Sequence, residues 1–330
     1  PGAASSGATF STSSFVYSAG LSGTAHAVAP VTLGASDISG IDFGFNFDTV
    51  VNTNNSGQGS LRQAVANANV LAGEASLAQN GLTAGAEHLN FMISNGSTSP
   101  GGALAASGGL RSTINYYSGS PATATITLSS GEIAISGALR LPGASTATRI
   151  SGNTASRIFN TSADVQISNL TLMSGTVNGN GGCVLATGGS LSLTGAILSG
   201  CTASNGQGGA VHATGTTLSV TSSTVQNGQA TSGNGGGLWV SGGSATLSTS
   251  TFSGNNATNG GGGALWLAGA ASATVSDSTF SSNRTGTTGG AGIGMAASGT
   301  VTVTGATFTA NDGTNGGGGG LYVASGTATL

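Results

Sequence analysis

The feature that most constrains this chain is a repeat of 27 or 28 residues that runs through its second half. A Gly-rich turn followed by an apolar residue returns in each repeat, and two further apolar positions return in phase with it. The three columns are Val184, Val211, Leu238, Leu265, Ile293 and Leu321; Leu193, Val220, Leu247, Val275, Val303 and Leu330; and Leu198, Val225, Phe252, Phe280 and Phe308. Such a period indicates one structural unit per repeat, stacked into a solenoid.

Each repeat holds three short alternating runs separated by Gly, Ser, Thr and Asn, which is typical of strands joined by turns. Stacking places equivalent residues of successive coils about 4.8 Å apart in parallel sheets, so each apolar column becomes an interior ladder. We therefore predict an all-β chain, a right-handed parallel β-helix with three short strands per coil. A β-propeller is disfavoured because its blades need about 40 residues.

Charge is scarce, with 6 Lys and Arg and 9 Asp and Glu among 330 residues, whereas Gly occurs 61 times. The net charge of −3 offers nothing to a phosphate backbone, so we expect no nucleic-acid partner. No apolar run approaches the roughly 18 residues of a membrane helix, so we expect no membrane-spanning segment. Hydrophobic residues make up 37% of the chain, which argues against disorder.

The sequence divides into three segments. We expect residues 1–48 to be an N-terminal β region or the end of a preceding domain, because apolar residues alternate in Ser14–Tyr17 and Ile41–Phe47. Residues 49–123 are predicted to form a capping segment. Residues 124–330 are predicted to form the β-helix, with an irregular coil around Phe159, and we expect its coils to continue beyond residue 330.

One short helix is predicted near residues 60–72, within the capping segment. Ser60 followed by Gln63 is a capping-box pattern, and apolar residues recur from Leu61 at helical spacing. The open end of a β-helix exposes unpaired backbone and a hydrophobic core. We therefore expect this helix to lie across that end and protect it.

Two sets of motifs resemble known families. The segment from Val51 to Val65 (VNTNNSGQGSLRQAV) resembles the motif that opens the β-helix of large bacterial secreted repeat proteins. The repeated Gly-Gly-Ala-Val and Gly-Gly-Ala-Leu turns, with Phe-x-x-Asn at Phe252, Phe280 and Phe308, are similar to the paired motifs of chlamydial polymorphic membrane proteins. Those relatives are surface-displayed adhesins exported as autotransporter passengers, so the resemblance implies display and contact.

An enzyme of this architecture needs a placed set of catalytic groups. Glycoside hydrolysis requires two carboxylates at a defined separation, and only Asp277 and Asp312 lie in the regular coils, at different repeat positions. His26, His88 and His212 are distant in sequence and lack metal-ligand spacing. We predict no catalytic residues, no cofactor and no metal site.

Four aromatic residues form a candidate contact stripe. The outward position after each Gly-Gly-apolar turn carries His212, Trp239, Trp266 and Tyr322, and strand alternation places their neighbours inside. One interpretation is that these rings stack on each other or pack beneath a loop. The other is that they contact sugar rings or a neighbouring fibre, because exposed aromatic area marks interaction sites.

Three further contacts are predicted from the register of the coils. Asn255, Asn283 and Asn311 each follow an inward Phe by three residues, so we predict a structural ladder of stacked amides. Cys183 and Cys201 lie in the first regular coil, within reach of a disulfide bond. The predicted exposed ion pair joins two residues at equivalent positions of adjacent coils, Arg284 and Asp312.

The favoured function is a non-enzymatic extracellular protein, a bacterial surface stalk, adhesin or filament-forming module. The first alternative is a carbohydrate-binding or carbohydrate-degrading β-helix, and the second is a phage or secretion-associated spike. Expected partners are further coils of the same chain or identical subunits, and surface glycans or host or neighbouring-cell surfaces. The expected location is secreted or at the cell surface.

Overall fold

The computed structural model describes residues 15–17, 21–23, 49–71, 85–91, 93, 124–143, 145–287, 289–314 and 317–330. The chain forms two compact units, 1–46 and 47–330. In the smaller unit, β1 (Phe15–Tyr17) pairs antiparallel with β2 (Leu21–Gly23). The strand predicted at Ile41–Phe47 lies outside the described residues.

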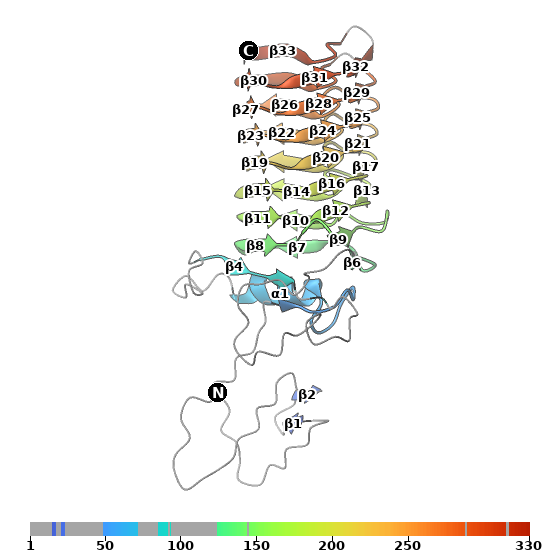
Figure 1. The fold of residues 1–330 in the computed structure, drawn as a ribbon, viewed down its shortest axis with the longest axis vertical. Helices are drawn as coiled ribbons and strands as arrows, with labels where there is room; N and C mark the ends of the chain where they lie inside the picture. Colours follow the sequence, from blue (N-terminus) through green and yellow to red (C-terminus); the bar gives the residue numbers. More distant parts are fainter. Residues whose placement is uncertain are drawn as a thin grey trace. The chain divides into compact units, whose positions relative to one another are not determined.

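Residues 47–330 contain a parallel β-helix whose coils stack along one axis (Figure 1). Equivalent strands of successive coils pair in rows, here called ladders. The first and second ladders form one sheet, because β30 contributes to both. The first ladder contains β7 (Ile133–Ile135), β10 (Phe159–Thr161), β14 (Val184–Thr187), β18 (Val211–Thr214), β22 (Leu238–Ser241), β26 (Leu265–Gly269), β30 (Ile293–Thr304) and β33 (Leu321–Thr329). The second ladder contains β4 (Glu87–His88), β8 (Leu139–Pro142), β11 (Val165–Ser168), β15 (Ser190–Thr194), β19 (Thr217–Thr221), β23 (Ser244–Ser248), β27 (Ser272–Ser276) and the later parts of β30 and β33.

The other two ladders form separate sheets. The third ladder contains β6 (Ala124–Thr127), β9 (Thr148–Ser151), β12 (Thr171–Met173), β16 (Ile197–Ser199), β20 (Thr224–Gln226), β24 (Thr251–Ser253), β28 (Thr279–Ser281) and β31 (Thr307–Thr309). The fourth contains β13 (Thr176–Val177), β17 (Thr202–Ala203), β21 (Gln229–Ala230), β25 (Asn256–Ala257), β29 (Arg284–Thr285) and β32 (Asp312–Gly313). The sequence predicts the first three strands of each coil. It does not show the fourth, because two residues are too short to display alternation.

The predicted apolar columns lie in register inside the β-helix. Val184 pairs with Val211, and the same column continues through Leu238 to Leu321. The third column ends in a stack of phenyl rings, with Phe252 and Phe280 centroids 4.8 Å apart and nearly parallel. The interior is therefore a continuous ladder of buried side chains, as the repeat predicts.

The irregular coils predicted upstream are also present. Phe159 lies between Ile133 of the preceding coil and Val184 of the following one. These coils advance by 25 or 26 residues on the first two ladders and by 22 to 26 on the third, where the later coils advance by 27 or 28, which is why the repeat is harder to see there. Glu132, Arg140, Arg157 and Asp164 all lie in these coils.

The single helix of the described residues is α1 (Leu61–Leu71). Ser60 caps it, since the Gln63 amide N–H donates to Ser60 Oγ at 3.2 Å. The predicted capping box is only half formed, because the Gln63 side chain donates to Asn67 one turn further on. Leu61, Val65 and Ala68 are buried against the coil end, as expected of a capping helix.

Three polar side chains of this segment cover the free backbone beside β7. Asn55, Arg62 and Asn69 are spaced seven residues apart. Their partners are backbone groups of Ser129, Ser130, Gly131, Glu132, Ala134, Ser136 and Gly137. These side chains replace the hydrogen bonds of a missing preceding strand, and so close this edge to other strands.

Candidate functional site

The aromatic residues lie in one column on the outer side of the first ladder. Backbone pairing places His212 beside Trp239, Trp239 beside Trp266, and Tyr322 beyond Gly294. The order predicted from the sequence is therefore correct. The column runs parallel to the axis of the β-helix.

The rings use their faces for contacts within the protein. His212 stacks on Trp239 with ring centroids 4.2 Å apart and an interplanar angle of 11°. His212 occupies the predicted outward position, but the interpretation of an exposed contact ring is wrong for it, because only 6% of the residue is exposed. The indole of Trp239 covers one face of the imidazole, and the turn before β18 brings Gly208 against the backbone of Val211 and His212.

Trp266 lies in a slot made by glycines. A side chain on Gly261, in the turn of the same coil, would collide with the indole, and so would one on Gly294 of the next coil. Trp239, Trp266 and Tyr322 are each half-buried. The interpretation that fits this geometry is the structural one, in which the rings fill space beside the turns. Stacking on sugar rings would need the face of Trp239 that His212 covers or the faces of Trp266 that the glycines enclose.

Burial sets the charge state of His212. Loss of solvation, together with the smaller effect of the nearby Arg157 charge, lowers its pKa to about 4. Its Nδ1 is buried without a hydrogen-bond partner among the described residues, as is Nε1 of Trp239. The imidazole is therefore neutral near pH 7 and unsuited to act as a cation there.

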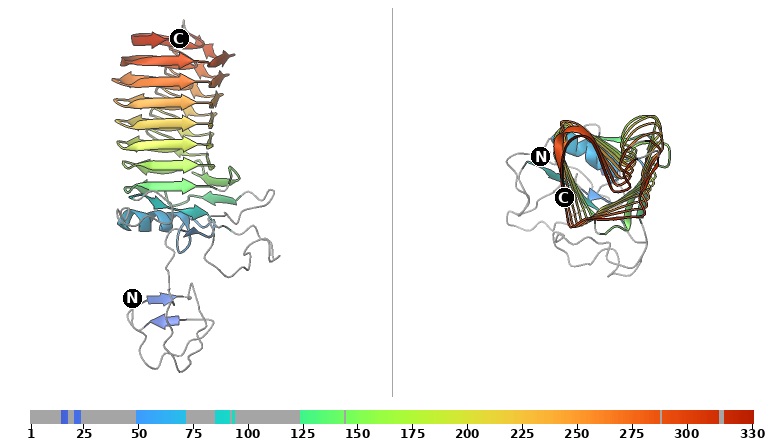
Figure 2. Two further views of the ribbon diagram at one scale, coloured as in Figure 1. Left: turned by 60° about the vertical axis from the view of Figure 1, so that its left-hand side comes forward. Right: turned by 90° about the horizontal axis from the view of Figure 1, so that it is seen from above.

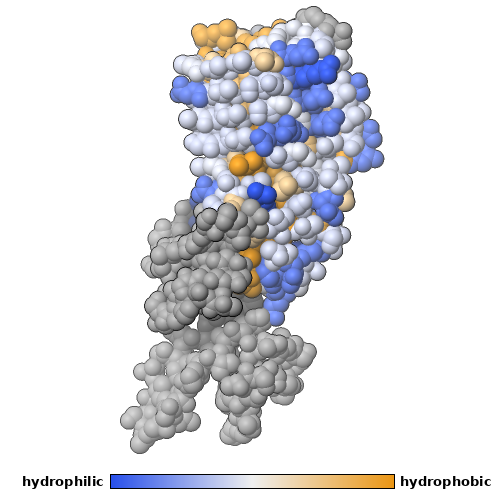
Figure 3. Space-filling view, turned by 45° about the vertical axis from the view of Figure 1, so that its right-hand side comes forward, coloured by the Kyte–Doolittle hydropathy of each residue, from blue (hydrophilic) through white to orange (hydrophobic). Residues whose placement is uncertain are grey.

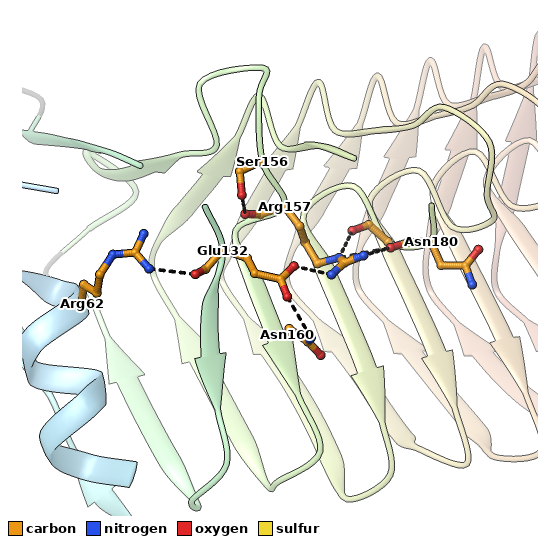
Figure 4. A network of polar contacts seen from close by, with 7 residues as sticks. Arg62, Glu132, Ser156, Arg157, Asn160 and Asn180 are labelled. Atoms are coloured by element: carbon orange, nitrogen blue, oxygen red, sulfur yellow. Dashed lines mark hydrogen bonds and ion pairs between the residues drawn. The ribbon is translucent and has the colours of Figure 1, made fainter. Parts of the chain in front are cut away.

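A polar network lies below this column, and the sequence reasoning missed it. Figure 4 shows Arg157 reaching Glu132 of the preceding coil and the carbonyl of Asn180 of the next one. Asn160 donates its amide to the other Glu132 oxygen at 2.9 Å. Arg62 of α1 joins the network by donating to the Glu132 carbonyl. The signal was available, since Glu132 and Arg157 are one coil apart in sequence.

The carboxylates of the β-helix mostly serve its own coils. Both oxygens of Glu132 accept hydrogen bonds, and Asp164 accepts two from Ser190 of the next coil. Asp312 forms the predicted ion pair with Arg284 at 3.3 Å, with both side chains exposed. Asp277 lies in the turn after β27, whereas Asp312 lies in β32 on the fourth ladder.

The asparagine ladder is present as predicted. Asn255 Nδ2 donates to Asn283 Oδ1 at 3.0 Å, and Asn283 Nδ2 donates to Asn311 Oδ1 at 2.9 Å. Each amide also donates to a carbonyl of the preceding coil, and Asn255 and Asn283 are fully buried. The ladder therefore satisfies turn backbone inside the β-helix.

The predicted disulfide between Cys183 and Cys201 is also present. Cys201 occupies, in the first regular coil, the turn position that later coils give to Asn255 and Asn283. A second ladder escaped the sequence reasoning: the backbone N–H of Ser223 donates to Ser250 Oγ, and that of Ser250 to Ser278 Oγ, at 3.1 Å each. These serines also recur at 27 and 28 residues.

No helix in the described part of the chain is long and apolar enough to cross a membrane. Among the same residues, no three His, Cys, Asp or Glu side chains gather to hold a metal ion.

The stacked coils and ladders define a parallel β-helix protein. The family model for the right handed beta helix region matches residues 157–330. This match covers more than half of the chain, so the protein belongs to the right-handed β-helix family. No curated protein and no solved structure matches it significantly.

Proposed function

We propose that this protein is a non-enzymatic extracellular module, a surface-displayed stalk or adhesin whose β-helix holds a binding face away from its anchor. The observation that carries the proposal is the use of its carboxylates. Glu132 engages both of its oxygens, and Asp164 and Asp312 engage one each, in contacts with a neighbouring coil, so these carboxylates join coils together.

Two further features support display outside the cell. A disulfide between Cys183 and Cys201 is favoured in oxidising compartments. The Val51–Val65 motif and the Phe-x-x-Asn repeats resemble bacterial secreted repeat proteins and chlamydial adhesins, which favours a bacterial surface protein.

The test is to compare binding with turnover. Purified protein is incubated with a panel of neutral and acidic polysaccharides and with bacterial and host cells, and new reducing ends, unsaturated products and bound protein are measured. We expect binding to at least one surface without new ends. Glycan cleavage catalysed by the purified protein would contradict the proposal.

The second candidate is a carbohydrate-degrading β-helix, and one observation favours it. Glu132 retains a side-chain exposure of 35% within the Arg157 network (Figure 4). Glu132→Gln decides between the two: cleavage lost in this variant would assign catalysis to Glu132. Gln166→Glu, on the neighbouring second ladder, serves as a control that adds a carboxylate elsewhere.

A further inference from the structure

The largest uniform surface of the β-helix lies on the second ladder. Every outward position of β15, β19, β23, β27 and the later parts of β30 and β33 carries Ser or Thr. The three columns of this hydroxyl face are Ser190, Thr217, Ser244, Ser272, Thr300 and Thr327; Ser192, Ser219, Thr246, Thr274, Thr302 and Thr329; and Thr194, Thr221, Ser248, Ser276 and Thr304. None of these residues is buried.

The hydroxyl face is a flat, regular grid. Successive strands lie about 4.8 Å apart, and alternate residues of one strand lie about 6.6 Å apart. The hydroxyls of Ser248 and Thr221 are closer, at 3.2 Å, because they hydrogen-bond to each other. Seen from above, the coils nearly superimpose (Figure 2), so the grid twists little from one coil to the next. Figure 3 turns another side forward, on which hydrophilic patches and a few hydrophobic ones interrupt the near-neutral surface. Beneath the face, buried Leu193, Val220 and Leu247 fix the backbone.

Charge is confined to the borders of this face. Asp164 and Arg140 lie in the coils below its first row, and Asp277 lies in the turn beside Ser276. The rows themselves carry no charge and no aromatic ring. The face therefore lacks the cations that bind phosphates and the Trp, Tyr and Arg anchors that dominate protein interfaces.

Its area also argues against a second copy of the chain as occupant. Six strands at about 4.8 Å and five residues at about 3.3 Å span on the order of 400 Å². A stable protein interface buries about 800 Å² on each partner. The ligand that fits this face is one that binds through many small, repeated contacts and needs no large aromatic or Arg side chain.

We infer that the hydroxyl face binds the surface of ice. A hydroxyl both donates and accepts hydrogen bonds, as water does, so a fixed grid of hydroxyls can take the place of one layer of water. The oxygens on faces of hexagonal ice form a rectangular grid whose two repeats are similar to those of this face. The Thr methyl groups between the hydroxyls restrict the positions open to water. This inference rests on the proposed function, because it names the surface to which the module adheres.

The test measures incorporation of the purified full chain into a slowly growing ice hemisphere, together with the growth of ice grains on annealing. We expect wild type to be concentrated in the ice and to slow grain growth. Thr246→Lys, at the centre of the grid, should reduce incorporation about tenfold, because a long charged side chain holds ice away from neighbouring rows.

Three matched variants complete the experiment. Thr246→Ser keeps the hydroxyl and should remain within about twofold of wild type, and so should Gln229→Lys on the fourth ladder. Unchanged melting temperatures show that the variants fold. Exclusion of wild type from ice, or full incorporation of Thr246→Lys, overturns the inference. So does loss of incorporation only in Ser253→Lys, on the third ladder. Binding to cells or glycans without ice binding would leave the proposed function standing.

Discussion

Asn283 and Arg284 are adjacent in sequence where the chain enters β29, yet they stabilise the stack in different ways. Asn283 points inward, is fully buried and hydrogen-bonds to Asn255 below and Asn311 above. Arg284 points outward and pairs with Asp312 of the next coil, with 61% of its side chain exposed. Both contacts join consecutive coils, but only one is shielded from water.

The comparison shows that the side on which a contact lies, interior or solvent, decides how much it stabilises the stack. The type of contact, hydrogen bond or ion pair, matters less. A buried hydrogen bond that is broken leaves donors and acceptors without water, which costs far more than its net contribution when formed. An exposed ion pair loses little, because water and salt screen both charges. The inner ladders should therefore dominate cohesion between coils.

The largest effect is expected from Asn283→Ala. The substitution leaves the Asn255 backbone N–H and the Phe252 carbonyl without their partners, so the free energy of unfolding should fall by about 2–4 kcal/mol. Urea denaturation monitored by circular dichroism measures it. Arg284→Ala, one residue away, is the matched control. Equal losses in the two variants would break the comparison.

The disulfide is a covalent contact at the inner turn position that Asn255 and Asn283 occupy in later coils, and breaking it tests how much that position stabilises the stack. The bond closes a loop with a sequence separation of 18, so the double variant Cys183→Ala and Cys201→Ser should lose about 3 kcal/mol. Thermal unfolding with and without reductant measures it. Reductant should destabilise wild type and leave the variant unchanged. A wild type indifferent to reductant would contradict a stabilising disulfide.

His212 separates direction from burial, because its side chain points outward, like that of Arg284, yet is buried, like that of Asn283. Its folded pKa of about 4 lies below the usual value near 6.5, so its contribution is fully present above pH 6.5 and is lost as the pH falls toward 4. Between pH 7 and pH 4.5 the loss should be about 2–3 kcal/mol.

The matched variant for this prediction is His212→Phe, which keeps a ring against Trp239 and cannot titrate. Its free energy of unfolding should depend less on pH than that of wild type, by about the same 2–3 kcal/mol. The pKa of His88 is also lowered by burial, and both proteins keep that residue, so its effect cancels. Identical pH profiles of the two proteins would contradict a buried, neutral His212.

The smallest effect is expected at the outer pair. Arg284→Gln should cost at most about 1 kcal/mol, and less at high salt. A double-mutant cycle with Asp312→Asn isolates the pair from other contacts. A coupling energy larger than the loss of unfolding free energy in Asn283→Ala would contradict the proposal that inner contacts stabilise the stack more than outer ones.

Much of the fold follows from the repeat, because stacking converts a sequence period directly into spatial register. Val184 and Val211 had to become neighbours once the coil length was known, and the same holds for Asn283 with Asn311 and for Arg284 with Asp312. The Glu132 and Arg157 network was missed because the first coils are shorter and of unequal length, which obscures that register.

The sequence by itself determined the coil, its inward columns and the identity of the residues on each outward column, since strand alternation assigns every side chain to one side. Only the tertiary structure decided which outward residues meet water. The Trp239 ring covers one face of His212, and glycines enclose Trp266, whereas Thr246 stays open. Covering depends on how a turn folds back across a neighbouring strand, and that path is set by φ values and by packing between coils that no repeat length specifies.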